Sequence, residues 1–322
     1  MWDAAAMSSR RSPLPQRDGL DPVWVRTPAR VRNEPLPWAT VAEFLRERLP
    51  AVNIDDWLKN HRFVDETGHP LTGQEPCQPA RFIWFHKDPP PPERPVPGEL
   101  TILHHDERII VMDKPHFLAT TPRGSHIRET ALIRARLTLG LPHIAPAHRL
   151  DRLTGGILLF TTEPRWRRPY QTLFETGAVT KTYEALAVPL AGAGEGFEVR
   201  SRIIKPRGSW QAIEVEGEPN AHTRGRLLQT STGPGGQVGR YELCPVTGKT
   251  HQLRVHMSSL GAPLLNDPLY PVVQEELLTP AGERFDQPLG LVARTLRFID
   301  PVDGTPRSYT SGIQLSLPSR DL

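Results

Sequence analysis

Residues 148–160 read His-Arg-Leu-Asp-Arg-Leu-Thr-Gly-Gly-Ile-Leu-Leu-Phe, and this stretch decides the fold around it. Its second half begins a short apolar run, residues 157–161, that is typical of a buried strand. The two glycines before the run allow a tight turn or the close approach of another group. We therefore predict that Asp151 lies on a loop that a rigid sheet supports.

Asp151 stands between Arg149 and Arg152. Such a carboxylate has two interpretations. Either it caps a turn while the arginines face solvent, or the arginines bind a polyanion while the carboxylate stays ionised for chemistry. The first is the commoner role of a loop aspartate, but the pattern as a whole favours the second.

The motif His148-Arg149-Leu150-Asp151 followed by Thr154-Gly155-Gly156 resembles the catalytic motif of the RluA family of RNA pseudouridine synthases, which reads HRLD, two variable residues and TSG. Gly155 stands where the family has serine, a difference that affects the turn more than the chemistry. The resemblance implies that Asp151 is catalytic. It also implies that Arg149 fills the space left by a flipped-out nucleotide.

A second motif, residues 181–185, reads Lys-Thr-Tyr-Glu-Ala. On a strand, Lys181 and Tyr183 point to one face, where they could meet a nucleotide. A strand tyrosine is more often a core residue with a satisfied hydroxyl. The Lys-x-Tyr pattern resembles the second motif of the family, whose tyrosine stacks against the target uracil, and the resemblance gives that role to Tyr183.

A third motif, residues 246–257, contains Thr250 as a predicted N-cap of a helix that ends at Gly261. Lys249 and Arg254 would then lie near the positive end of the helix dipole, where a bound anion best explains cations. His251 and Arg254 would share one side of the first turn.

This stretch resembles the family's TGRTHQIRVH, with Lys249 replacing arginine. The resemblance implies that Arg254 pairs with Asp151 and keeps it ionised, so we predict that Arg254→Met impairs catalysis more than folding. Residues 266–270, Asn-Asp-Pro-Leu-Tyr, resemble the family's G-D-x-x-Y. The expected RNA-binding residues are Arg149, Arg152, Lys181, Lys249 and His251.

Metal and disulfide chemistry are not expected. His251 and His256 are five residues apart with no acidic ligand spaced to complete a site. Cys77 and Cys244 are far apart and neither belongs to a C-x-x-C pair. The resemblance likewise implies an isomerisation that needs no cofactor, because nothing is oxidised and no outside group is added.

Composition predicts a folded protein, while the net charge alone says little about partners. The chain has 322 residues, 38% of them hydrophobic, and a formal net charge of +3. Between residues 123 and 181 ten Lys or Arg face four Asp or Glu, a surplus of six that favours a phosphate-bearing partner. A solvated helix face is the alternative for Arg165, Arg167 and Arg168. No segment suits a membrane span or signal peptide, so we expect a cytoplasmic protein. We also expect a monomer.

Four regions are predicted along the chain. Residues 1–35 are basic and aperiodic and should form a mobile arm, with RNA contact or functionless disorder as alternatives. Residues 36–87 resemble an S4-type RNA-binding module: a capping box at Thr40 and Glu43 begins one helix, residues 54–60 form another, and residues 62–65 and 81–86 form strands. Residues 88–98 should be a polyproline spacer, and residues 99–322 the catalytic domain.

The catalytic domain should be α+β with a mixed or antiparallel sheet, because strands outnumber helices and come in neighbouring runs. The resemblance implies a long bent sheet flanked by helices, with an RNA cleft across the middle. The expected helices are 129–139 and 164–177; the expected strands are 102–103, 109–112, 157–161, 179–188, 200–204, 211–215, 223–229 and 241–246.

The resemblance implies that the protein isomerises specific uridines of ribosomal or transfer RNA to pseudouridine. Two other classes stay open. One is a non-catalytic RNA-binding or ribosome-assembly protein on the same scaffold, which loss of Asp151, Tyr183 or Arg254 would favour. The other is a nucleoside hydrolase or glycosidase, which generally needs two carboxylates at the bond, whereas only Asp151 has a convincing setting.

Overall fold

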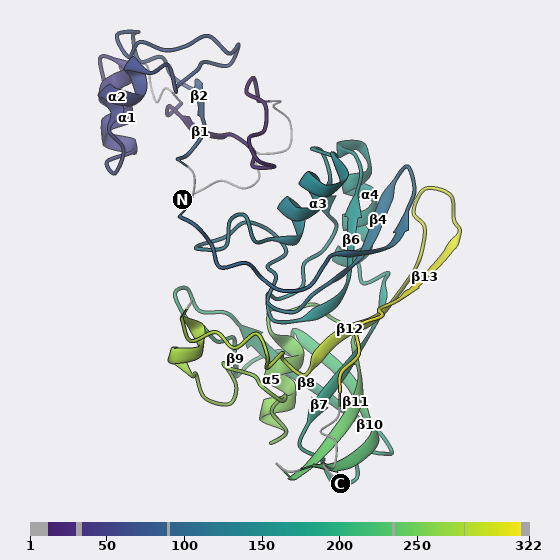
Figure 1. Cartoon of the computed structure of the whole chain (residues 1–322). Coiled ribbons are helices and arrows are strands. Elements are labelled where there is room, and N and C mark those ends of the chain that lie inside the picture. Colours follow the sequence, from purple (N-terminus) through teal and green to yellow (C-terminus); the bar gives the residue numbers. More distant parts are fainter. Residues whose placement is uncertain (1–11, 30–33, 89–90, 234–235, 280, 317–322) are drawn as a thin grey trace. The chain divides into compact units, whose positions relative to one another are not determined.

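The computed structural model describes residues 12–29, 34–88, 91–233, 236–279 and 281–316. The chain separates into two compact units, Met1–Pro91 and Pro92–Leu322 (Figure 1). Each unit has its own buried apolar core. Within the described ranges, no helix is both long enough and apolar enough to cross a membrane.

The first unit contains helices α1 (Val41–Arg48) and α2 (Ile54–Lys59) and an antiparallel pair of strands, β1 (Val23–Arg26) and β2 (Phe82–Phe85). The start of α1 is the predicted capping box. Thr40 Oγ1 accepts a hydrogen bond from the Glu43 amide, and the Glu43 carboxylate accepts one from the Ala39 amide. Both predicted helices are confirmed.

Two predictions for this unit are wrong. Strand β1 lies inside the segment predicted to be a mobile arm, and it pairs with β2. Its Val-Trp-Val run favours a strand but is too short to show a hydrophobic period in the sequence. Residues 62–65 form no strand, since Val64 makes only isolated bridges to Pro70 and Trp84. The rest of the predicted arm at residues 1–11 and 30–33 lies outside the described residues.

The second unit is built on one large mixed sheet, which confirms the predicted α+β class. Its strands run in the spatial order β3, β4, β6, β12, β7, β11, β10, β8, β9, with β13 beside β12 and β5 beside β6. The bounds are β3 (Thr101–His105), β4 (Ile109–Lys114), β5 (Ala145–Pro146), β6 (Gly155–Thr161), β7 (Thr180–Ala187), β8 (Phe197–Ile204), β9 (Ile213–Val215), β10 (Ala221–Gly233), β11 (Gly236–Pro245), β12 (Leu291–Ile299) and β13 (Pro306–Thr310).

Helices α3 (Ala131–Leu139), α4 (Pro164–Glu175) and α5 (Gln252–Ser259) and a short 3₁₀ helix, Glu275–Leu278, complete the unit. Helix α3 ends at Gly140, whose φ of 65° is the left-handed conformation that glycine adopts most easily. Helix α4 begins at Pro164, as predicted. Leu137 of α3 is 60% exposed.

Strand β12, which the sequence reading did not anticipate, joins the two strands that matter most for the site. It pairs in parallel with β6 and antiparallel with β7. A Cβ on Gly156 would lie 2.4 Å from the carbonyl oxygen of Ala293, so the second glycine of the motif is required for β12 to approach. The predicted close approach is therefore made to a strand.

The proline-rich segment 88–98, predicted as a spacer, is packed onto the second unit over residues 92–98. Val96 is buried in the core of the second unit. The Glu93 carboxylate accepts hydrogen bonds from the amides of Ile127, Arg128 and Glu129. Residues 92–98 therefore belong to the second unit, because one acidic and one apolar side chain fix them there.

Candidate active site

Asp151 lies on the loop that leads into β6, with 31% of its side chain exposed. His148 fixes the start of this loop: its Nε2 accepts a hydrogen bond from the Leu159 amide at 3.2 Å, and its ring stacks on Phe174. Burial, helped by the charge of Lys181, lowers the pKa of His148 to about 3, so the ring is a neutral acceptor. The loop is thereby tied to the sheet.

Arg254 approaches Asp151 from α5, with 3.8 Å between its Nη1 and Asp151 Oδ2. The guanidinium is 2% exposed and is held mainly by Asp267, through Nε at 2.8 Å and Nη2 at 2.6 Å. Burial alone would lower the pKa of Arg254, but the hydrogen bonds and charge of Asp267 outweigh it and raise that pKa. Asp267 thus aims a permanent cation at Asp151.

The function of Asp267 was missed by sequence reasoning, although its motif at residues 266–270 was recognised. Its side chain is fully buried, and its Oδ1 also accepts a hydrogen bond from the Leu269 amide at 2.9 Å. A bidentate pair of this kind fixes the plane of the guanidinium as well as its charge. The sequence signal for this pair was the aspartate of the fourth motif, because a buried arginine such as Arg254 needs an acidic partner.

Lys114 was also missed. Its ammonium is fully buried and donates hydrogen bonds to the carbonyl oxygens of Pro115 (3.0 Å), Leu118 (2.7 Å) and Arg152 (3.2 Å). Burial lowers the pKa of Lys114 to about 7, and the charge of Asp151 opposes that shift. The side chain therefore holds the backbone directly after Asp151.

His116 holds the next residue of the same loop. Its Nδ1 donates to the Leu153 carbonyl oxygen at 2.8 Å, and burial lowers the pKa of its ring to about 4. A Cβ on Gly155 would lie 2.8 Å from His116 Nε2. The family pattern has serine at this position. The missing side chain of Gly155 leaves the space that the His116 imidazole occupies.

Tyr183 lies on β7 opposite Leu243 and Ala293, and packs partly buried against the main core. Burial raises the pKa of its phenol, and the charge of Asp151 raises it further. The two side chains are thus close enough to interact electrostatically. Lys181 lies on the same strand, and its Nζ would be 3.8 Å from a Cβ on Gly248 in the third motif.

The third motif begins its helix later than predicted, and Thr250 is not the N-cap. That position belongs to His251, whose φ of 58° is left-handed. Gln252 replaces a capping side chain: its buried Oε1 accepts from Thr247 Oγ1 at 2.7 Å and from the Lys249 amide at 3.0 Å. The first turn of the helix is thus held by a glutamine that sequence reasoning passed over.

The predicted RNA-binding cations differ in their surroundings. Arg149 and Lys249 are exposed. Arg152 is instead engaged by the carboxylate of Glu283 and lies 3.4 Å from the Phe117 carbonyl oxygen. An RNA phosphate would have to displace Glu283 to reach Arg152, whereas it would meet Arg149 and Lys249 directly.

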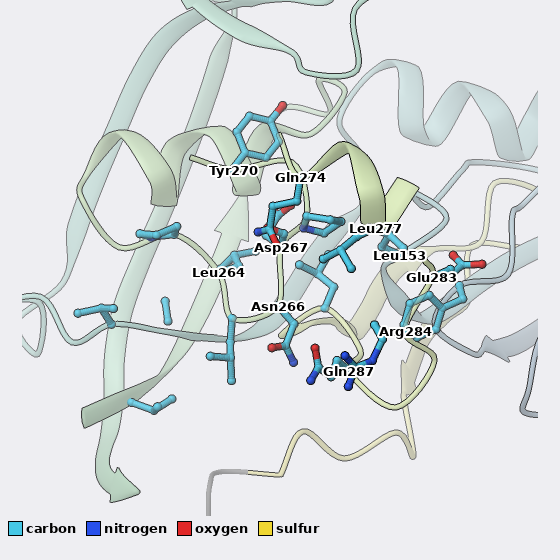
Figure 2. A pocket seen from close by; sticks show the side chains of 18 of the residues that line it. Leu153, Leu264, Asn266, Asp267, Tyr270, Gln274, Leu277, Glu283, Arg284 and Gln287 are labelled. Carbon is cyan, nitrogen blue, oxygen red and sulfur yellow. The ribbon is translucent and has the colours of Figure 1, made fainter. Parts of the chain in front are cut away.

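A pocket of about 430 Å³ lies beside Asp267 and Tyr270 (Figure 2). Its lining includes apolar side chains such as Leu264 and Leu277 and the polar Gln287. Asp267 and Tyr270 reach its wall, but Asp151, Tyr183 and Arg254 do not line it. The pocket therefore borders the residues that hold Arg254 and is separate from Asp151 itself. Among the described residues, no group of three or more His, Cys, Asp or Glu is arranged to hold a metal ion.

Comparison with known proteins defines the class. The family model described as RNA pseudouridylate synthase matches residues 108–259, a range that contains Asp151, Tyr183 and Arg254. The structure of human RNA pseudouridylate synthase domain containing 1 is 25% identical, with a TM-score of 0.54, and covers 66% of this chain and 84% of its own. That of domain containing 4 is 26% identical, with a TM-score of 0.50 and coverages of 67% and 88%.

Similar proteins of known sequence indicate the family within this class. An uncharacterized RNA pseudouridine synthase of Synechocystis sp. is 31% identical over 64% of this chain and 70% of its own length. The dual-specificity RNA pseudouridine synthase RluA of Pasteurella multocida is 32% identical over 65% and 90%. The mitochondrial tRNA pseudouridine(32) synthase of Saccharomyces cerevisiae is 29% identical over 57% and 38%. The chain belongs to the RluA family of RNA pseudouridine synthases, as its motifs predicted.

Proposed function

We propose that this protein converts specific uridines of structured ribosomal or transfer RNA to pseudouridine, with Asp151 as the catalytic group. The observation that carries the proposal is the pairing of Asp151 with Arg254 at 3.8 Å, while Asp267 holds that arginine from behind. Asp267 accepts the hydrogen bonds of Arg254 Nε and Nη2 and offsets most of the arginine charge. Arg254 therefore orients Asp151 while the carboxylate keeps most of its negative charge. The Asp151 side chain stays 31% exposed, so a substrate can reach it.

The reaction exchanges bonds within one nucleotide. The bond between N1 and C1′ breaks, the uracil turns, and a bond between C5 and C1′ forms while the proton of C5 is released and N1 gains one. Duplex stacking hides these atoms, so the nucleotide must first be flipped out. Exposed Arg149, on the same loop as Asp151, is suited to fill the space that it leaves.

Tyr183 is proposed to hold the detached uracil. Its phenol, whose pKa burial raises further, is protonated at neutral pH and offers a ring face and a hydrogen-bond donor. A neutral aromatic ring packed against the core also excludes water, which protects the detached base from hydrolytic loss. Lys181, Lys249 and His251 are proposed to contact the RNA around it.

The choice of ribosomal or transfer RNA rests on the relatives, since one is named for dual specificity and another for a tRNA position. A cytoplasmic location and a monomeric state form part of the same proposal. Cell fractionation and sedimentation of the purified protein test those two points.

The function is tested by incubating purified protein with unmodified ribosomal and transfer RNA transcripts that carry tritium at C5 of uridine. Conversion releases tritium from C5, and mapping then locates pseudouridine in the RNA. Release of free uracil would instead indicate a hydrolase. Tight binding without tritium release would indicate an assembly factor, and either result would refute the proposal.

A further inference from the structure

The loop between β8 and β9, residues 205–212, presents an unusual surface near the site. Trp210 is 57% exposed there. Ile204 and Ile213, which pair across the two strands at the base of the loop, are 39% and 41% exposed. Lys205 and Arg207 on the same loop are also exposed. Large apolar groups gathered on a surface among cations indicate a binding function.

The loop is anchored to the candidate active site through Tyr270. The Ala212 amide donates to the Tyr270 hydroxyl at 2.8 Å, and that hydroxyl donates to the Ala212 carbonyl oxygen at 2.9 Å. The guanidinium carbon of Arg254 lies 5.3 Å from the centre of the Tyr270 ring. Tyr270 and Arg254 thus connect the anchor of this loop to Asp151.

The anchor has two further supports. The Gln211 side-chain amide donates to the Leu269 carbonyl oxygen. Ala212, Tyr270 and Val255 of α5 belong to one buried cluster. The backbone beside Trp210 is thus held rigidly, so the exposure of the indole results from a fixed loop conformation.

The cations of the loop lie within the electrostatic field of the site. Lys205 donates from Nζ to the Ser209 carbonyl oxygen, which closes the loop next to Trp210. Burial lowers the pKa of Lys205, the charge of Arg123 lowers it further, and the charge of Asp151 opposes both. Arg123 and Asp151 are therefore within electrostatic range of Lys205, and a phosphate bound at the loop would offset the repulsion between the two cations.

We propose that Trp210 is a stacking platform for an unstacked nucleobase beside the target uridine, and that Lys205 and Arg207 bind the phosphates of that nucleotide. An indole face accepts any base, and flanking cations hold the backbone. The inference rests on the proposed function only in taking RNA as the ligand. It adds a contact outside the family motifs.

The test compares Trp210→Ala and Trp210→Phe with the wild type in binding a fluorescein-labelled RNA hairpin that has a uridine-rich loop. Stacking on an aromatic side chain contributes about 1–3 kcal/mol per base, so Trp210→Ala should weaken binding by roughly 5- to 150-fold. Trp210→Phe should keep most of the affinity. Leu137→Ala is the matched control, because Leu137 is 60% exposed on α3.

A walk of single abasic sites through the hairpin loop identifies the partner base. At one position the abasic RNA should bind the wild type as weakly as intact RNA binds Trp210→Ala, and combining the two changes should add no further loss. Equal affinities of wild type and Trp210→Ala, or additive losses at every position, would overturn the inference. If binding depends on Trp210 but no pseudouridine forms, the stacking platform stands and the proposed function falls.

Discussion

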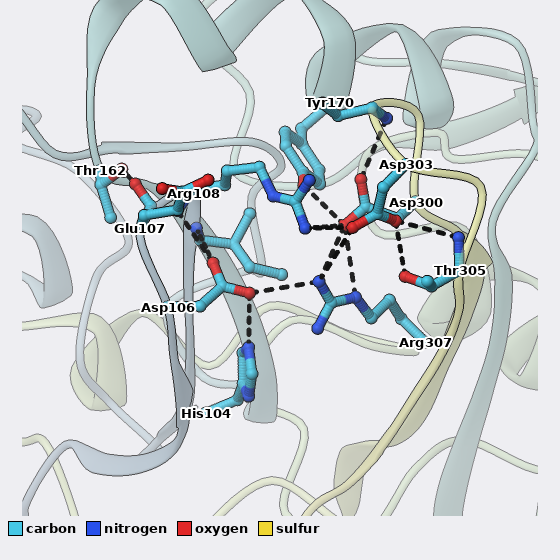
Figure 3. A network of polar contacts seen from close by, with 12 residues as sticks. His104, Asp106, Glu107, Arg108, Thr162, Tyr170, Asp300, Asp303, Thr305 and Arg307 are labelled. Atoms are coloured by element: carbon cyan, nitrogen blue, oxygen red, sulfur yellow. Dashed lines mark hydrogen bonds and ion pairs between the residues drawn. The ribbon is translucent and has the colours of Figure 1, made fainter.

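Two groups of charges in the second unit can be compared, the cluster shown in Figure 3 and the Asp151 site. In the cluster, Asp300 is fully buried and accepts from the Tyr170 hydroxyl at 2.9 Å. It also pairs with Arg307 at 3.2 Å and Arg108 at 3.5 Å. Asp151, by contrast, is 31% exposed and has one guanidinium at 3.8 Å.

The cluster ties the β3–β4 turn to the β12–β13 turn and to α4. Arg108 also meets Asp303, and Arg307 meets Asp106. Hydrogen bonds from His104 and the backbone outweigh burial and lower the pKa of Asp106 to about 2. The buried carboxylate of Asp300 is surrounded by partners and has a structural role. Asp151 instead shares Arg254 with Asp267 and remains 31% exposed.

The sharpest way to separate the two groups is Asp151→Asn. The amide keeps the shape of the carboxylate and loses its charge, so turnover should fall on the order of 10³-fold or more, at the upper range of a general acid–base contribution. RNA affinity and thermal stability should stay close to those of the wild type, because Asp151 is part-exposed. Tritium release beside a thermal melt measures both, and near-normal turnover would exclude Asp151 as the catalytic group.

The opposite pattern is expected for Asp300→Asn. The substitution removes the buried charge that Arg108 and Arg307 share and leaves them only their pairs with Asp303 and Asp106. It should cost about 3 kcal/mol of unfolding free energy, the lower end for a broken buried ion pair. Urea unfolding measures the loss. Turnover per folded molecule should be unchanged, so a stable but inactive Asp300→Asn protein would remove the distinction between the groups.

Arg254→Met tests the site from its supporting side. The sequence predicts that catalysis suffers more than folding, but the structure alters that expectation, because the substitution leaves Asp267 buried without its cation. Unfolding free energy should fall by about 3–5 kcal/mol together with activity.

Arg254→Met combined with Asp267→Asn provides the control. The double variant should recover part of the stability and none of the activity. Recovery of turnover in the double variant would show that Arg254 has no function beyond neutralising Asp267.

The smallest effect on stability is expected at Gly155, at the end of the loop that carries Asp151. Gly155→Ser restores the family residue but pushes against the imidazole of His116, and such overpacking costs about 1–3 kcal/mol. Adding His116→Ala removes the obstacle, so the double variant should lose less stability than the sum of the two single losses. Urea unfolding of all four proteins measures the coupling, and strictly additive losses would refute the contact.

Most local elements followed from the residues. Thr40 and Glu43 specify the start of α1, Pro164 and Gly140 mark helix ends, and the apolar run after Gly156 forms β6. These features depend on neighbours within a few positions, so sequence patterns reveal them. Strand β1 escaped because its four residues carry too short a pattern.

The sequence alone determined the class of the second unit, its catalytic motifs and the family. Tertiary structure decided which charges meet: that Asp267 holds Arg254, that Lys114 and His116 grip the backbone after Asp151, and that Arg152 pairs with Glu283. The physical reason is distance along the chain. These ion pairs and hydrogen bonds link residues 13 to 131 positions apart, and no local pattern specifies which partner burial will select.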